Sequence, residues 1–286
     1  MTSLKTYLAA TAALLTVGAT AAHATPFAVS GINFSNLNLT GVVGTSNTTV
    51  NSSTVTTSSS ANYDNTVPTA NSNSGNLQSG SDVIQSFSGT GAAPGQNVFA
   101  PALVGGGARG DAGIFGQINS NASAGVVAEG RLLVPSSSAA SAGGTSTGIN
   151  ISFTTAGGTV GLTFDASAFL QAMTTDAGDG ASSEINASFA VRSGSTQFLN
   201  FAPTELNTAV SASGVNGNQS FTQATRNFST SVTLAAGTYQ LTLLSGAQER
   251  LQTGALPAPV PEPMSMALLG SALIGLGVIR KRSRRA

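Results

Sequence analysis

The stretch INISFTTAGGTVGLTF, Ile149–Phe164, decides the fold class of this chain. Every second residue is apolar in Ile149–Phe153 and again in Val160–Phe164. Successive side chains of a β-strand point to opposite faces, so this alternation predicts two strands that each bury one face. The Gly157-Gly158 pair between them predicts a tight turn. We therefore expect a β-hairpin in which the two strands pair with each other.

Further period-2 runs occur at residues 27–40, 185–191, 228–234 and 239–243. In the first run the alternation slips near Gly31, which predicts a β-bulge there. Asp165–Met173 fits either a short helix or a continuation of the preceding strand. No long helical periodicity occurs between residues 25 and 255, so we expect an all-β exported domain, a β-sandwich or jelly roll.

A Ser/Thr/Asn-rich segment covers residues 41–80. In residues 45–60, fourteen of sixteen residues are Ser, Thr or Asn. Such a stretch has little to bury, while threonine favours strands. It therefore fits either an exposed edge strand with a long loop or a flexible tract that extends to about residue 80. Residues 105–110 match G-x-G-x-x-G, but no helix is predicted after them, so we expect a flexible glycine loop rather than a nucleotide site.

The N-terminus is typical of a secretory signal peptide. Lys5 precedes an apolar stretch, and Ala22 and Ala24 are the small residues that signal peptidase requires. This order predicts a signal peptide over residues 1–24, with cleavage after Ala24. The partners that this signal predicts are the export machinery and signal peptidase.

Composition excludes several kinds of chemistry. Residues 25–259 hold ten acidic residues and five arginines, a net charge of −5, and the whole chain has no cysteine. The single histidine, His23, lies in the predicted signal peptide. Without histidine, cysteine or lysine in the exported domain, Ser-His-Asp, Ser-Lys and thiolate catalysis are excluded. The domain also lacks the basic footprint of a nucleic-acid binder, and no cofactor is predicted.

The C-terminus has three consecutive parts. Residues 256–263 form a proline-rich linker with a proline at every second position from Pro257 to Pro263, which favours an extended, accessible backbone. Residues 264–279 carry no charge and predict a single transmembrane helix, although ~24 Å is short for a ~30 Å hydrocarbon core. Residues 280–286 form a basic tail that predicts a cytoplasmic membrane stop. Its basic residues are Arg280, Lys281, Arg282, Arg284 and Arg285.

This C-terminus resembles the PEP-CTERM sorting signal of Gram-negative bacteria. The resemblance covers about 27 of the 286 residues and includes the motif Pro261, Glu262 and Pro263. It implies that an exosortase, a membrane-embedded processing enzyme, recognises the motif and removes the anchor. It also implies that the protein is held in the inner membrane before processing and then reaches the cell surface or extracellular matrix, where this family is linked to exopolysaccharide and biofilm. It implies nothing about residues 25–255.

Few residues of the exported domain suggest a chemical site. Asp176, Asp179 and Glu184 surround two glycines and are weak candidates for a calcium site, although a solvated turn is the commoner outcome of such a sequence. Any two of the ten acids could also form a glycosidase pair. The chain has no tryptophan and three tyrosines in all, which weighs against sites that stack sugars on aromatic rings.

The function predicted from the sequence is therefore a non-enzymatic surface or matrix protein, sorted by an exosortase and associated with exopolysaccharide or biofilm. Two alternatives stay open. One is a secreted, carboxylate-dependent polysaccharide hydrolase. The other is a calcium-stabilised adhesin.

Overall fold

The computed structural model describes residues 26–41, 49–63, 69–75, 84–90, 103, 105–117, 122–133 and 140–253. Apart from one 3-10 turn, η1 (Thr204–Leu206), the regular elements in these ranges are β-strands, so the all-β prediction is confirmed. None of the described helical structure is long and apolar enough to cross a membrane. The predicted signal peptide, sorting motif, transmembrane helix and basic tail lie outside these ranges.

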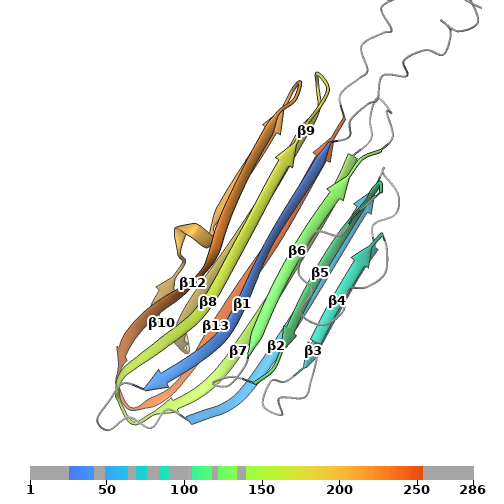
Figure 1. Cartoon of the computed structure of the whole chain (residues 1–286). Helices are drawn as coiled ribbons and strands as arrows, with labels where there is room; N and C mark the ends of the chain where they lie inside the picture. Colours follow the sequence, from blue (N-terminus) through green and yellow to red (C-terminus); the bar gives the residue numbers. More distant parts are fainter. Residues whose placement is uncertain are drawn as a thin grey trace, which may run out of the picture. The chain divides into compact units, whose positions relative to one another are not determined.

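The strands form two antiparallel sheets (Figure 1). Sheet A contains, in spatial order, β12 (Asn218–Leu234), β8 (Gly158–Met173), β1 (Phe27–Gly41), β6 (Ser123–Arg131), β5 (Gly107–Phe115) and β4 (Ile84–Gly89). Sheet B contains β10 (Thr196–Phe201), β9 (Gly180–Ser193), β13 (Gly237–Gln252), β7 (Ala140–Thr155), β2 (Thr49–Tyr63) and β3 (Thr69–Gly75), with β11 (Thr208–Ser213) also paired to β9.

The two sheets pack face to face and enclose the main hydrophobic core. The alternation seen in the sequence explains this arrangement, because each strand turns its apolar residues toward the opposite sheet. Leu162 and Phe164 of β8 are fully buried, as are Ile151 and Phe153 of β7, and all four belong to one continuous core.

The prediction of a hairpin at Ile149–Phe164 is wrong. Strand β7 pairs with β13 and β2 in sheet B, whereas β8 pairs with β1 and β12 in sheet A. The glycine turn is an arch that carries the chain from one sheet to the other, and Gly157 and Gly158 adopt φ values of 101° and 119°. Alternation cannot distinguish the two structures, because a hairpin and an arch both give each strand one apolar face.

The chain passes from one sheet to the other at two further places. The chain also crosses between the sheets from β1 to β2 and from β12 to β13. Strands β12, β8 and β1 are neighbours in sheet A, and their continuations β13, β7 and β2 are neighbours in the same order in sheet B. The described ends of these strands therefore lie side by side at one end of the sandwich (Figure 1).

Residues 45–60 supply a strand rather than a flexible tract over the described part. Strand β2 alternates between buried and exposed residues and lies between β7 and β3, so it is not an edge strand. The edge of the sheet is β3, which is exposed from Thr69 to Ser74. The expected alternation is present in β2, but its buried positions are mostly Ser and Thr, which is why the sequence did not reveal them.

Three smaller predictions can also be compared with the structure. Asp165–Met173 continues β8 as a strand. The bulge of β1 lies between Ser35 and Asn38 rather than at Gly31, where the ring of Phe169 instead leaves no room for a Cβ atom. The expected glycine loop at 105–110 is wrong in its second half, because β5 begins at Gly107 and is buried along its whole length.

Candidate functional site: an uncharged hydroxyl face

The outer face of sheet B carries rows of hydroxyl and amide side chains. The register aligns outward residues of β2, β7, β13 and β9 across the sheet. These residues are Thr54, Thr56, Ser58 and Ser60 on β2, Ser146, Asn150, Ser152 and Thr154 on β7, Thr238, Gln240, Thr242 and Gln248 on β13, and Asn186 and Ser188 on β9. The hydrophobic exception among the outward positions of β13 is Leu244, with 51% exposure.

Hydrogen bonds between neighbouring strands hold several of these side chains in place. The hydroxyl oxygens of Ser58 and Ser146 lie 2.7 Å apart, and those of Thr154 and Thr238 lie 3.3 Å apart. The Thr242 hydroxyl donates to Asn150 Oδ1 at 2.8 Å. Cross-strand polar pairs of this kind restrict rotamers, so the face presents an ordered array of donors and acceptors.

A hollow of about 490 Å³ opens on this face over β2, β3 and β7. Its polar lining includes Ser58, Ser60, Asn71, Ser146 and Gln248. Strands β2, β3 and β7 contain no charged residue, so no formal charge from these strands lines the hollow. Such a site can hydrogen-bond a neutral polar ligand but offers no ion pair to a charged one.

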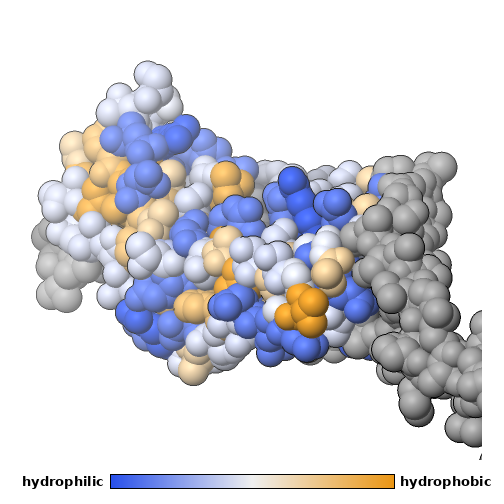
Figure 2. Space-filling view, turned by 90° about the horizontal axis from the view of Figure 1, so that it is seen from above, coloured by the Kyte–Doolittle hydropathy of each residue, from blue (hydrophilic) through white to orange (hydrophobic). Residues whose placement is uncertain are grey.

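The charges of this face lie on β9 and β13, where Glu184 is the register partner of Gln248. Glu184 and Arg192 on β9 and Arg250 on β13 point outward from strands farther from β3. Figure 2, which looks down on the molecule from above the view of Figure 1, shows hydrophobic residues in small separate patches among hydrophilic ones on the described surface. The large outward side chains of this face are thus mostly polar, with Leu244 as an exception, and β2, β3 and β7 contribute no charge to it.

A second polar cluster is buried on the outer face of sheet A. The Arg109 guanidinium pairs with Glu129 at 2.9 Å, and the backbone N–H of Leu103 donates to Glu129 at 3.0 Å. Asp111 follows Arg109 by two residues on the same face of β5 and accepts a hydrogen bond from Gln85 at 3.0 Å. Its other carboxylate oxygen has no hydrogen-bond partner among the described contacts.

Burial governs the protonation of Asp111. The side chain is fully buried, and desolvation raises the pKa of Asp111 to about 6, against the opposing effects of the Gln85 hydrogen bond and the Arg109 charge. A carboxyl with such a pKa suits general-acid chemistry. Asp111 and Glu129 have exposures of 0% and 1%, however, so neither reaches an open surface where a polymer could bind.

The predicted calcium residues do not form a metal site in the described structure. Asp179 is buried and accepts backbone N–H groups of Asp176 at 3.0 Å and Thr175 at 3.4 Å, which closes the turn between β8 and β9. Glu184 points outward from β9. Within the described ranges, no three His, Cys, Asp or Glu side chains come close enough together to hold a metal ion.

Comparison with known proteins adds no family assignment. No protein-family model matches the chain, and no curated protein has a significantly similar sequence. Pro261, Glu262 and Pro263, the signal-cleavage residues Ala22 and Ala24, and the basic stop lie outside the described residues.

Neither polar feature was evident from the sequence. The hydroxyl face was hidden because Ser and Thr occupy buried and exposed positions of β2 alike, so polarity gave no alternation. The buried cluster had a weak signal in Asp111 and Glu129, the two acids of the Gly/Ala-rich residues 98–134, which also contain Arg109. Charges in such a stretch need partners when strands bury both faces.

Proposed function

We propose that this chain is a non-enzymatic protein of the bacterial cell surface or extracellular matrix, and that its exported domain contacts uncharged exopolysaccharide. The outer face of sheet B carries the proposal for the domain, because its hydroxyls and amides match the donors and acceptors of a neutral sugar polymer. The C-terminal motif with Pro261, Glu262 and Pro263 carries the proposal that an exosortase-type enzyme sorts and processes the protein.

The mode of contact follows from the side chains available. Without tryptophan, the face cannot use the largest aromatic platforms for stacking sugars. Hydrogen bonds to Ser58, Ser146, Asn150 and Gln248 would instead provide many weak contacts along a polymer. Each such bond contributes only about 0.5–1.5 kcal/mol net. Measurable binding of the protein then requires that many such hydrogen bonds form together on one polymer or one surface.

Retention of the full chain on insoluble polysaccharide tests the binding proposal. We expect binding to a neutral β-glucan and little binding to alginate, since residues 25–259 carry a net charge of −5 and repel an anionic polymer. Substituting both Ser58→Ala and Ser146→Ala should weaken binding to the β-glucan roughly tenfold, because two net hydrogen bonds are lost. Equal binding to both polymers would contradict the proposal.

The matched control places the same change on the other sheet. Ser229 and Ser231 are exposed on β12, and Ser229→Ala with Ser231→Ala removes two surface hydroxyls far from the hollow. This control should bind β-glucan like the unchanged chain. If both double variants bind equally well, the hydroxyl face is not the binding site.

The sorting proposal has a separate test. The full chain is produced in a host with an exosortase and in the same host without it, and the mature mass is measured. We expect loss of residues 264–286 only in the first host. Glu262→Ala should block this loss, whereas Pro257→Ala, in the same proline run but outside the motif, should not. A mature protein that retains residues 264–286 in both hosts would refute exosortase processing.

A further inference from the structure

The edge strand β3 lacks the features that protect the other edges. Its seven residues, TANSNSG, include no charge, no proline and no bulge, and Thr69–Ser74 are all exposed. Natural sheets usually protect an edge with charged residues, proline, a bulge or a covering element, because an open edge offers unpaired backbone donors and acceptors to another strand. Strand β3 is therefore a surface that is available for pairing.

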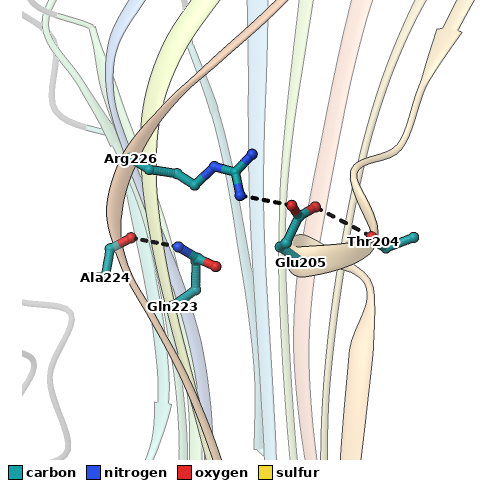
Figure 3. A network of polar contacts seen from close by, with 5 residues as sticks. All are labelled: Thr204, Glu205, Gln223, Ala224 and Arg226. Carbon is teal, nitrogen blue, oxygen red and sulfur yellow. Dashed lines mark hydrogen bonds and ion pairs between the residues drawn. The ribbon is translucent and has the colours of Figure 1, made fainter.

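The opposite side of the sandwich shows such protection. At the edge of sheet A, β12 has a bulge between Gln223 and Arg226, and Arg226 donates to Glu205 of η1 at 2.8 Å (Figure 3). At the edge of sheet B, β10 has a bulge between Gln197 and Leu199. The neighbouring edge strand β11 packs against β8 and β12. These strands are poor partners for another chain.

The fourth edge, β4, is covered by its neighbour. The side-chain amides of Asn71 and Asn73 on β3 donate to the backbone carbonyls of Phe87 (at 3.4 Å) and Gln85 on β4. These bonds tie the edge of sheet B to that of sheet A and occupy acceptors that a foreign strand would need. Among the edge strands that the structure describes, β3 is thus the one with no bulge, no covering element and no charge.

We propose that β3 of one chain pairs antiparallel with β3 of a second copy, so that two B sheets join into one continuous sheet. A second copy is the favoured occupant because both surfaces are uncharged and equal in length, so neither repulsion nor mismatch opposes a two-fold contact. Full overlap of Thr69–Gly75 places its middle residue, Ser72, on the two-fold axis, with Asn71 opposite Asn73 of the other copy. The two Ser72 hydroxyls then lie beside each other and can hydrogen-bond, while the amides of Asn71 and Asn73 keep their bonds to β4.

This pairing would have a consequence for the hydroxyl face. The hollow reaches β3 through Ala70 and Ser72, so a two-fold contact places the hollows of two copies side by side. A seven-residue strand forms a small interface, in the weak class below about 1,200 Å². Association would therefore respond to the high local concentration of a protein gathered on a cell surface or in a matrix.

Disulfide trapping tests the contact, because the chain has no cysteine of its own. Ser72→Cys in the full chain places two thiols opposite each other, with Cα atoms about 4.5–5.5 Å apart, within the range of a disulfide. On mild oxidation in detergent solution we expect a covalent dimer, detected by mass under non-reducing conditions. Ser231→Cys, also exposed on an edge strand, is the matched control and should stay monomeric.

Equal dimer fractions in the two variants, or no dimer from Ser72→Cys, would overturn the proposal. A second measurement does not depend on thiols. Ser72→Lys should weaken self-association of the full chain roughly tenfold in sedimentation equilibrium, since like charges directly opposite in a sheet repel. Mixing the Ser72→Lys chain with a Ser72→Glu chain should give a heterodimer, because opposite charges then face each other. An unchanged chain that sediments as a monomer up to about 500 µM, where weak pairs are populated, would also overturn the proposal.

Discussion

The interior of the sandwich has two regions of opposite character. Between β8, β9, β12 and β1, phenylalanines pack ring against ring: Phe164 stacks on Phe189 at 4.4 Å and on Phe228 at 5.3 Å, and Phe34 meets it edge-on at 5.8 Å. Between β2 and β4 the interior is made of hydroxyls. Thr57 and Ser86 lie 2.7 Å apart across the sheets, and similar contacts join the next pair of serines.

The two regions show two ways to join a pair of sheets. Aromatic rings fill the space between the sheets and are stabilised by removal of apolar area from water. In the hydroxyl region small residues let the sheets approach closely, so backbone and hydroxyl groups bond across the gap. The Ser86 hydroxyl, for example, lies 3.1 Å from the carbonyl oxygen of Thr57. The stability of the aromatic region should therefore depend on large side chains that fill the interior. The stability of the hydroxyl region should depend on small side chains that let the backbones stay close together.

Removal of a central ring should have the largest effect. Phe164 is fully buried, so Phe164→Ala leaves a cavity among its stacked neighbours and should lower the free energy of unfolding by about 3–5 kcal/mol. Urea denaturation of the full chain in detergent measures this change. The control Leu244→Ala truncates a side chain that is 51% exposed and should change stability by less than about 0.5 kcal/mol. Similar losses in both variants would mean that the aromatic cluster is not the main source of stability.

Addition of a methyl group in the hydroxyl region should come next. A Cβ atom at Gly110 would lie 2.9 Å from the backbone oxygens of both Gly144 and Ser60. Since backbone cannot rotate away, Gly110→Ala should lower the free energy of unfolding by about 3 kcal/mol, the upper part of the range for overpacking. At Gly180 no atom lies within 4 Å of such a Cβ, so Gly180→Ala should be neutral or stabilising in the same denaturation experiment.

This contrast also explains how far the sequence could be interpreted. The aromatic region was predictable, because Val160, Leu162 and Phe164 alternate with polar residues and all three are buried. Their strand and its buried face followed from that pattern alone. The pattern did not show which strands pair with it, because alternation leaves a hairpin and an arch equally possible at Gly157–Gly158. That choice depends on which distant strands supply the neighbouring edges, here β1 and β12.

The hydroxyl region was not predictable by the same reasoning. In β2 the buried residues Thr57 and Ser59 have the same chemistry as their exposed neighbours, so no difference in polarity marks the buried face. A buried hydroxyl is tolerated only when it finds a partner, and the partners Ser86 and Ser88 lie about thirty residues away in another sheet. The candidate binding face could not be predicted for the same reason, because it is the exposed side of the same strands.

The pH dependence of stability tests a third polar environment, the outer face of β5. Burial raises the pKa of Asp111 to about 6, whereas an unfolded aspartate ionises near about 4. Between these values the folded protein holds a proton that the unfolded chain has released, so stability should fall as pH rises from about 4 to about 6. Because asparagine does not titrate, Asp111→Asn should reduce this loss of stability by about 2 kcal/mol. Parallel stability curves for the two proteins over pH 4–7 would contradict the burial argument.

The smallest effect is expected from single hydroxyls across the sheets. Thr57→Val keeps the shape of a buried side chain but removes its hydrogen bond to Ser86, and should cost about 1 kcal/mol. Ser86→Ala should cost a similar amount, because each change leaves the other hydroxyl with one contact fewer. When both are replaced, no hydroxyl of the pair is left unsatisfied, so the double variant should be more stable than the sum of the single changes implies. A double-mutant cycle in urea measures this coupling. Strict additivity would show that the two hydroxyls do not interact, and that close approach of the backbones alone joins the sheets at β2 and β4.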